Sequence, residues 1–170
     1  MKSKKNLVFL GMMGSGKSSI GSLVAKKLKL QFVDIDKEIE KNLKITIRKI
    51  FETKGEDYFR KIEEKICLRI LKLNKKIISL GGGSFLNNKV REEIQNNHIS
   101  FWLNWNTSTI IKRIKKNKNR PMLKNMTEND VNKLIIKRKK IYEKAHLKIN
   151  CENLSKSEII NKIIKLYEGK

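Results

Sequence analysis

The sequence is poor in proline and cysteine, with one proline and two cysteines in 170 residues. A single proline and a hydrophobic fraction of 39% favour a globular chain that is rich in helix and poor in long loops. Cys67 and Cys151 lie far apart and form no Cys-x-x-Cys pair. We therefore expect reduced, buried thiols and no disulfide.

Long apolar runs are missing as well. No stretch approaches the roughly eighteen uninterrupted apolar residues of a membrane-spanning helix. Residues 1–5 lead into a short apolar run, not into a signal-peptide core. We expect a cytoplasmic protein without a membrane partner, organised as one domain over residues 1–170.

Acidic residues are scarce, at 17 against 40 lysines and arginines, and the formal charge is +23. Such a charge suggests a nucleic-acid-binding surface. However, the basic residues are spread along the expected helices, and no aromatic side chains interleave them as a stacking platform requires. We therefore expect no nucleic-acid partner. Residues 112–144 hold thirteen basic and three acidic residues, a local excess that suits anionic ligands.

Residues 11–18 read Gly-Met-Met-Gly-Ser-Gly-Lys-Ser and match the pattern G-x-x-x-x-G-K-[S/T]. An apolar run at residues 7–10 precedes them and an amphipathic run at residues 19–28 follows, so strand, glycine loop and helix are the expected order. Glycines let the backbone wrap a phosphate, and the start of a helix favours an anion. Lys17 would reach the β- and γ-phosphates, and Ser18 would bind Mg²⁺. The segment predicts a nucleoside triphosphate site.

Two carboxylates follow the second expected strand, residues 31–34, in the sequence Asp34-Ile35-Asp36. Ligands of open parallel sheets bind beyond the carboxyl ends of the strands. Asp34 would hold the metal through its water shell. Asp36 would accept a proton or a hydrogen bond from the hydroxyl group of the molecule that receives the phosphate. The alternative is that both carboxylates only cap the following helix.

Apolar residues at helical spacing predict two helices, at residues 45–51 and 62–73, with a turn at Lys54-Gly55. Arg60 lies beside aromatic residues and has Glu63 three positions later. This pattern is typical of a guanidinium held rigidly for an anionic substrate group, with a surface salt bridge as the alternative.

Three glycines, residues 81–83, end the third expected strand at residues 76–80 and indicate close approach to the backbone. No aspartate ends this strand, so the metal would depend on Ser18 and Asp34.

His98, just before the fourth expected strand, is expected to be a surface turn residue.

A basic, polar loop at residues 115–121 contains the only proline and follows an expected helix at residues 106–114. It predicts a lid over about residues 112–125, from which Arg120 would reach the nucleotide phosphates and stabilise transition-state charge. The alternative is a plain solvated loop. Downstream, Arg138 falls among the apolar positions of a helix that starts near Thr127, and an inward-facing arginine requires an anion.

Further strands are expected at residues 99–103 and 147–151, and Ser155 with Glu158 forms a capping box for the last helix. Strands and helices alternate without a repeat or a linker. This alternation predicts an α/β protein with helices on both faces of a mostly parallel five-stranded sheet.

These residues together resemble the shikimate kinase family, a branch of the nucleoside monophosphate kinase-like P-loop enzymes. The matching segments are Gly-Met-Met-Gly-Ser-Gly-Lys-Ser-Ser at residues 11–19, Phe-Val-Asp-Ile-Asp at 32–36, Gly-Glu-Asp-Tyr-Phe-Arg-Lys-Ile-Glu at 55–63, Leu-Gly-Gly-Gly at 80–83, Asn-Arg-Pro-Met-Leu at 119–123, and Arg138 with Tyr142. They occur in family order over nearly the whole chain, and as a set they are highly specific.

The resemblance implies transfer of the γ-phosphate of ATP to the 3-hydroxyl of shikimate, on the route to chorismate and the aromatic amino acids. It implies a three-layer P-loop kinase fold with strand order 2-3-1-4-5, substrate-binding helices over about residues 34–62, and one Mg²⁺ ion per subunit. We expect a monomer.

The shikimate-binding residues implied are Asp36, Arg60, Gly82 and Arg138. The ATP-binding residues implied are Gly14, Ser15, Gly16, Lys17, Ser18, Ser19 and Arg120, and those for the metal are Ser18 and Asp34. The catalytic residues expected are Lys17, Asp36 and Arg120.

The chain departs from the family at two places. Lys49 stands where relatives often carry an acidic residue, and residues 151–157 lack the arginine and proline that relatives often place around adenine. A related kinase with gluconate as acceptor, or a nucleotide-dependent nucleic-acid-binding module, are the alternatives. A GTPase is less supported, because no Asn-Lys-x-Asp segment is found.

Overall fold

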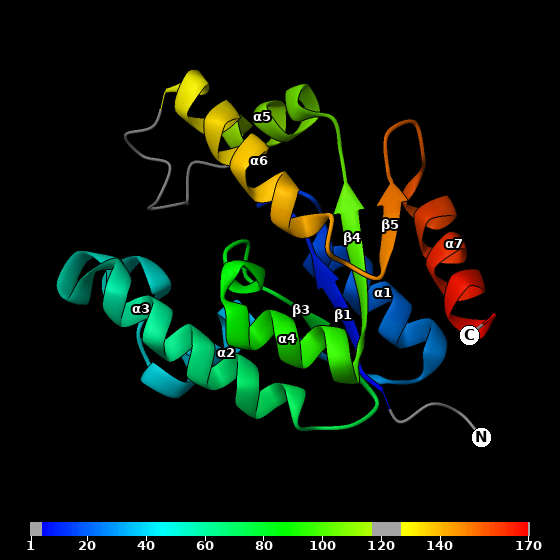
Figure 1. Ribbon diagram of the computed structural model, residues 1–170, viewed down its shortest axis with the longest axis horizontal. Coiled ribbons are helices and arrows are strands. Elements are labelled where there is room, and N and C mark those ends of the chain that lie inside the picture. Colours follow the sequence, from blue (N-terminus) through cyan, green and yellow to red (C-terminus); the bar gives the residue numbers. More distant parts are fainter. Residues whose placement is uncertain (1–4, 117–126, 170) are drawn as a thin grey trace.

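A five-stranded parallel sheet forms the centre of the protein (Figure 1). The computed structural model describes residues 5–116 and 127–169. The strand order is β2-β3-β1-β4-β5, and each neighbouring pair is parallel. This arrangement confirms the predicted order 2-3-1-4-5. The strands are β1 (Leu7–Leu10), β2 (Gln31–Asp34), β3 (Lys76–Ser79), β4 (Ile99–Asn104) and β5 (Leu147–Asn150).

The central strand β1 has apolar side chains on both faces because helices cover the sheet on both sides. Leu7 and Phe9 belong to one buried cluster, and Val8 and Leu10 belong to another. Successive side chains of a strand point to opposite faces, so each cluster takes every second residue of β1. The apolar run at residues 7–10 is uninterrupted because its side chains fill two buried clusters, one on each face of the sheet.

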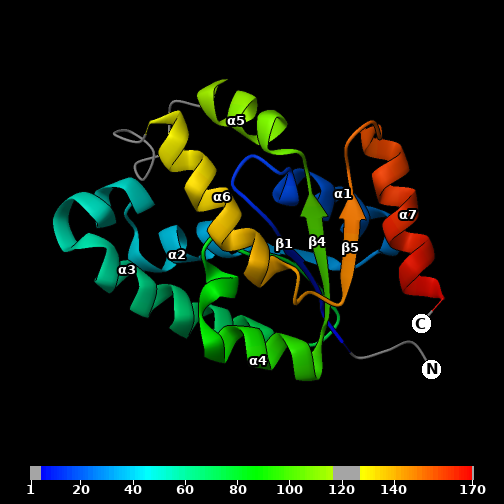
Figure 2. The ribbon, with the colours of Figure 1, turned by 45° about the horizontal axis from the view of Figure 1, so that its top comes forward.

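Two layers of helices complete the fold (Figures 1 and 2). The cluster around Leu7 and Phe9 is filled by α1 (Lys17–Leu28) and α7 (Lys156–Glu168). The opposite cluster is filled by α2 (Ile35–Leu43), α3 (Ile47–Leu71), α4 (Asn88–Asn97), α5 (Thr107–Lys116) and α6 (Glu128–Tyr142). A short 3-10 helix, η1 (Ser84–Leu86), follows the three glycines.

The helix ends follow the sequence signals closely. Ser155 and Glu158 form the reciprocal capping box predicted for α7, and Thr127 forms one with Asp130 at the start of α6. The turn predicted at Lys54-Gly55 is narrower than expected, because only Gly55 leaves helical geometry, at φ 78° and ψ 177°. α3 therefore consists of two helical segments joined by a kink.

The prediction for His98 was wrong. His98 is 5% exposed, and its Nδ1 accepts a hydrogen bond from the backbone N–H of Asn6 at 3.4 Å. It ends α4 just where β4 begins beside β1, so the neighbouring strand covers it. Burial lowers the pKa of His98 below its usual value, and the nearby Glu93 only partly opposes that shift.

The cysteine prediction was correct, since Cys67 and Cys151 are buried free thiols. Burial raises the pKa of both, that of Cys151 to about 12. Over residues 5–116 and 127–169, none of the helices has the length and apolar character that crossing a membrane requires.

Candidate active site

The glycine loop between β1 and α1 has the backbone geometry that its sequence predicts. Gly14 and Gly16 have φ of 79° and 87°, a left-handed conformation that other residues adopt only with strain. Gly16 directly precedes the first turn of α1, so the loop ends at a helix N-terminus. The loop and this helix start are arranged as an anion-binding site.

Lys17 is nearly buried at this helix start. Its Nζ donates hydrogen bonds to the carbonyls of Gly11, at 2.9 Å, and Met12, at 3.0 Å. The ammonium group therefore lies over the loop, within the concave side where phosphates would bind.

Ser18 and Asp34 meet at the carboxyl end of the sheet. The hydroxyl of Ser18 donates to Oδ2 of Asp34 at 2.5 Å, and Ser79 Oγ lies 3.4 Å from the same hydroxyl. Asp34 also accepts a hydrogen bond from the backbone N–H of Lys37 at 3.3 Å and so caps α2. Asp34 can therefore cap α2 with one oxygen and still be available to a metal ion with the other, so the two interpretations do not exclude each other. A hydroxyl and a carboxylate side by side at a phosphate loop are the oxygen donors that Mg²⁺ prefers.

The turn at residues 81–83 brings together side chains from three helices. A Cβ placed on Gly81 would lie 2.6 Å from Oε1 of Glu63 and 2.9 Å from Oδ1 of Asp36. A Cβ on Gly82 would lie 3.2 Å from Nη1 of Arg138, and one on Gly83 would lie 2.5 Å from Nη1 of Arg60. A larger residue at Gly81 or Gly83 would therefore displace these side chains, and one at Gly82 would crowd Arg138, so glycine keeps the three charged groups in place.

Arg60 is held in place by two carboxylates and a ring. Its Nη1 donates to Glu63 at 2.7 Å, its Nη2 donates to Glu56 at 3.0 Å, and its guanidinium lies 5.1 Å from the centre of the Phe59 ring. Burial by itself would lower the pKa of Arg60, but the two carboxylates outweigh it and raise that pKa. Glu63 is buried and also accepts a hydrogen bond from Ser84 at 2.7 Å. The pair is therefore more than a surface salt bridge.

Arg138 faces inward from α6, as predicted, and is 4% exposed. Its Nε and Nη1 have no hydrogen-bond partner among the residues that the structure describes. A buried cation with unsatisfied donors is costly unless an anion binds to it.

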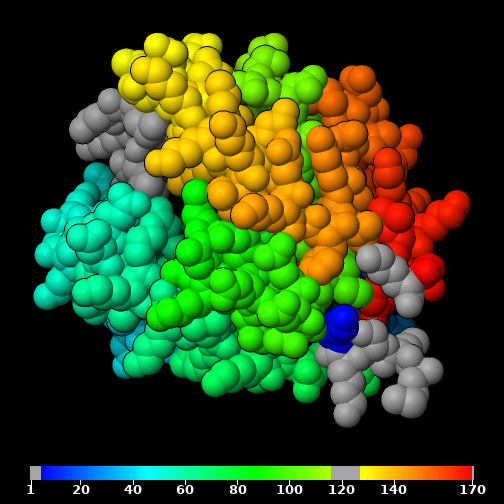
Figure 3. Space-filling model, viewed as in Figure 1, coloured from blue at the N-terminus to red at the C-terminus, as the bar shows by residue number. Residues whose placement is uncertain are grey.

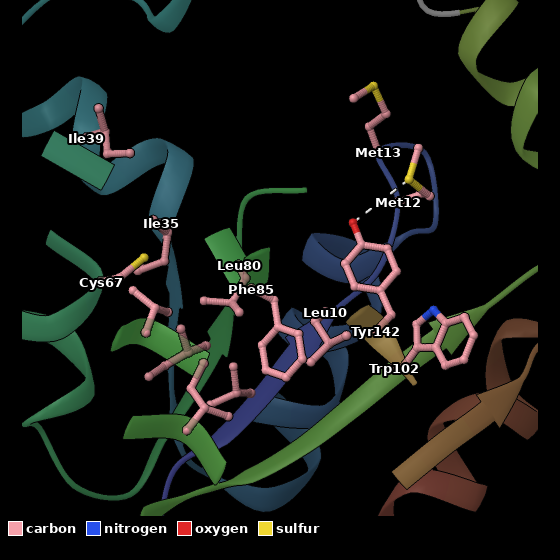
Figure 4. Close-up of a cluster of buried hydrophobic side chains, with 14 of the residues drawn as sticks. Leu10, Met12, Met13, Ile35, Ile39, Cys67, Leu80, Phe85, Trp102 and Tyr142 are labelled. Atoms are coloured by element: carbon pink, nitrogen blue, oxygen red, sulfur yellow. Dashed lines mark hydrogen bonds between the residues drawn. The ribbon is translucent and has the colours of Figure 1, made fainter. Parts of the chain in front are cut away.

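Tyr142 supports the glycine turn from the same helix. Its hydroxyl donates to the carbonyl of Gly82 at 2.5 Å and points toward Met12 of the phosphate loop (Figure 4). Burial raises the pKa of Tyr142 to about 12, so the hydroxyl remains a donor at neutral pH. Tyr142 thus links the loop at residues 11–18 to the turn at residues 81–83.

Two neighbouring cavities adjoin this turn. One, of about 490 Å³, is lined by α3, η1, α4 and α6 and contains Arg60 and Arg138. These helices meet on the face of the molecule that Figure 3 shows. The other, of about 280 Å³, is lined by the phosphate loop together with Asp34 and Asp36. Gly82 lines the second cavity and Gly83 lines the first. An anionic acceptor and a triphosphate can therefore bind on either side of one turn.

Sequence reasoning missed Trp105 and Arg113, which contact the phosphate loop through its carbonyl groups. The indole Nε1 of Trp105 donates to the carbonyl of Ser15 at 2.9 Å, and Nη1 of Arg113 donates to that of Gly14 at 3.3 Å. The only signal available was that Trp105 directly follows the strand next to β1.

The predicted lid falls mostly on residues 117–126, outside the described part of the chain. Arg120 belongs to this segment, and its role stays a prediction.

A parallel sheet with a phosphate loop after its central strand, and an anion-binding cavity beside that loop, defines a P-loop kinase of the nucleoside monophosphate kinase-like class. Residues 13–168 match the family model described as shikimate kinase. The chain belongs to the shikimate kinase family. This confirms three predictions from the sequence: the family resemblance, the fold and the enzyme class. The activity of that family is ATP-dependent phosphorylation of shikimate, as the sequence predicted.

Individual relatives agree with this assignment. The chain is 40% identical over 165 residues to shikimate kinase of Thermodesulfovibrio yellowstonii, covering 96% of this chain and 95% of that protein. It is 40% identical over 167 residues to shikimate kinase of Bacillus subtilis, covering 95% and 88%.

Solved structures agree as well. Shikimate kinase from Acinetobacter baumannii in complex with shikimate superposes with a TM-score of 0.92 at 29% identity, covering 99% of this chain and 95% of that one. A gluconokinase from Sinorhizobium meliloti has a TM-score of 0.59 at 16% identity, which shows a shared fold alone.

Proposed function

We propose that this chain transfers the γ-phosphate of ATP to the 3-hydroxyl of shikimate, with the shikimate carboxylate bound between Arg60 and Arg138. The observation that carries this proposal is the buried guanidinium of Arg138, two of whose nitrogens find no partner within residues 5–116 and 127–169 and would be satisfied by an anion. Arg60 and Arg138 lie against consecutive glycines, Gly83 and Gly82. Two planar guanidinium groups suit one carboxylate, because each can donate a pair of hydrogen bonds.

Asp36 is proposed to orient the hydroxyl group that receives the phosphate. Its Oδ1 lies beside Gly81, and it lines the same cavity as Lys17. The carboxylate is thus located between the arginines and the phosphate loop, where an acceptor hydroxyl would lie. Asp36 would accept that hydroxyl's hydrogen bond and take its proton late in the transfer.

The nucleotide phosphates are proposed to bind in the loop and the first turn of α1. Lys17 would exchange the carbonyls of Gly11 and Met12 for the β- and γ-phosphate oxygens. Because phosphoryl transfer proceeds through a loose transition state, positioning and charge neutralisation dominate. Lys17, at the start of α1, would supply positive charge to the transferred phosphate, and Arg120 is proposed to supply it from the predicted lid. The residues proposed to bind ATP are Gly14, Ser15, Gly16, Lys17, Ser18, Ser19 and Arg120.

One Mg²⁺ ion is proposed to bind at Ser18 and Asp34. The adjacent hydroxyl and carboxylate fit such an ion, which usually takes one or two protein oxygens together with phosphates and water. When bound, the ion would neutralise the charge of the β- and γ-phosphates.

We further propose that the protein acts as a cytoplasmic monomer. Arg60, Arg138, Asp36 and the phosphate loop line two neighbouring cavities of one chain, which is compatible with a monomer. The two free thiols are compatible with a reducing compartment.

An acceptor assay tests the proposed function. ADP release should depend on added shikimate and should be much slower when shikimate is omitted or replaced by quinate or gluconate. Equal or faster turnover with gluconate would mean that the acceptor is wrong, even though the phosphate loop still binds ATP.

Substituting Gly83 by Ala should weaken shikimate binding without affecting ATP. The new Cβ would lie 2.5 Å from Nη1 of Arg60, too close for a non-bonded contact, and would displace this flexible side chain. Since hydrogen bonds to charged groups are worth more than neutral ones, the KM for shikimate should rise by about tenfold. Steady-state kinetics with each substrate varied would measure it.

A double-mutant cycle provides the control. In an Arg60→Ala background, Gly83→Ala should add little, because the group that it displaces is already gone. Additive effects of the two substitutions would contradict this explanation.

A further inference from the structure

Trp105 and Arg113 form a stacked pair against the phosphate loop. Trp105 follows β4, and Arg113 lies on α5 with its Cζ 3.7 Å from the centre of the indole ring. This short distance indicates a guanidinium stacked on the ring face, an arrangement that arginine and tryptophan favour. Both side chains are partly buried.

Each member of the pair also holds one carbonyl of the loop. Trp105 donates from Nε1 to the carbonyl of Ser15 at 2.9 Å, and Arg113 donates from Nη1 to that of Gly14 at 3.3 Å. These carbonyls belong to two successive peptide groups. Tryptophan has only a donor, so its indole N–H can fix a carbonyl but cannot compete for the loop's N–H groups.

Fixing these carbonyls also fixes the N–H groups of the same peptides. A trans peptide is planar, and its C=O and N–H point in opposite directions. The Ser15 carbonyl points to Trp105, so the N–H of Gly16 points away from Trp105. Gly16 lines the cavity of about 280 Å³ with Lys17 and Ser18. In the preceding peptide, the N–H of Ser15 donates to the carbonyl of Met12 at 3.1 Å, so that peptide is fixed at both ends.

We propose that Trp105 is a positioning residue for the phosphate loop: its N–H orients the Ser15–Gly16 peptide, and its ring holds Arg113 on the peptide before it. This inference rests on the proposed role of residues 11–18 in binding phosphates. Dipoles that are oriented before the ligand arrives bind it at a lower entropic cost. Trp105 would therefore increase the affinity for the triphosphate without contacting it.

Trp105→Phe tests this inference, because it keeps an aromatic face under Arg113 and removes the N–H together with part of the indole surface. The affinity of the full-length protein for ADP and for inorganic tripolyphosphate, both with Mg²⁺, should be measured by calorimetry. We expect both to weaken by about tenfold, the order expected for leaving one carbonyl without its partner. The KM for ATP should rise similarly, whereas the KM for shikimate should not change.

Tripolyphosphate separates the loop from the rest of the nucleotide, because it has no base or ribose. If Trp105→Phe weakens ADP binding but leaves tripolyphosphate binding unchanged, the pair acts on the nucleoside and the inference is wrong. Unchanged binding of both ligands would also overturn it. If the wild-type protein binds neither ligand, the proposed function fails, and this inference fails with it.

Lys148 provides a matched control, because its Nζ lies 4.9 Å from the centre of another indole ring, that of Trp102, outside the phosphate loop. Lys148→Ala should leave tripolyphosphate binding unchanged. Arg113→Lys is a second variant, which keeps the charge on α5 but loses the planar stacking. It should weaken tripolyphosphate binding by at least about threefold, with only a small loss of thermal stability in the free protein. If Arg113→Lys binds tripolyphosphate as tightly as the wild type does, the proposed role of the Trp105 ring in holding Arg113 on the loop is contradicted.

Discussion

Replacing Asp36 by Asn should lower kcat by about 10²- to 10⁴-fold, the range that a positioned general base contributes. Asparagine has nearly the same size as aspartate, so the turn at Gly81 and the start of α2 should be preserved. The amide, however, has no charge and cannot take a proton from the acceptor hydroxyl. Since Lys17 and Ser18 are unchanged, the affinity for ADP should remain near that of the wild-type protein.

Turnover at saturating shikimate and ATP, combined with calorimetry for ADP, would measure both quantities. Glu38→Gln is the matched control, because Glu38 is an acidic residue of the same first turn of α2. That variant should retain normal kcat. Near-normal turnover in Asp36→Asn would remove Asp36 from the mechanism.

Replacing Arg138 by Met should raise the KM for shikimate by about a hundredfold, the order found when one partner of a buried charge pair is removed. The KM for ATP should change little, because Arg138 lines the larger cavity and not the one formed by the phosphate loop. Arg138→Lys should recover only part of the affinity, since an ammonium group lacks the paired donors of a guanidinium. Kinetics with each substrate varied in turn would separate the two KM values.

Thermal unfolding adds a second readout for Arg138. Two nitrogens of this buried cation lack partners in the part of the chain that the structure describes, so Arg138→Met should be at least as stable as the wild type in the absence of ligand. Shikimate should raise the Tm of the wild-type protein and raise that of the variant much less.

Lys140→Met, an exposed substitution on the same helix, is the control and should behave like the wild type. A collapse of ATP binding in Arg138→Met would place Arg138 in the nucleotide site instead.

Local patterns were sufficient to predict a parallel five-stranded sheet covered on both faces and the phosphate loop, whereas the strand order 2-3-1-4-5 was implied by the family resemblance. The alternation of apolar runs with amphipathic segments gave five strands and their covering helices, because each element is specified by nearby residues. The loop at residues 11–18 was also predicted correctly, since its glycines, lysine and serine are adjacent in sequence. Arg138 was recognised as inward-facing from helical periodicity alone, and it is indeed buried.

Features that depend on distant contacts could not be predicted from local patterns. His98 was expected at the surface but is buried against Asn6, the residue just before β1, which lies 92 residues away in the sequence. Trp105 was missed because the carbonyl that it holds is 90 residues away, at Ser15. The positions of Arg60 and Arg138 on neighbouring glycines likewise arise only when α3, α6 and the end of β3 come together.

The central claim is that two guanidinium groups bind one carboxylate beside a triphosphate site. A crystal structure of the protein with shikimate and ADP tests it most directly. The account predicts that the shikimate carboxylate accepts hydrogen bonds from both Arg60 and Arg138, with its 3-hydroxyl next to Asp36. A bound shikimate whose carboxylate lies away from both arginines, or arginines that point apart into solvent, would contradict it.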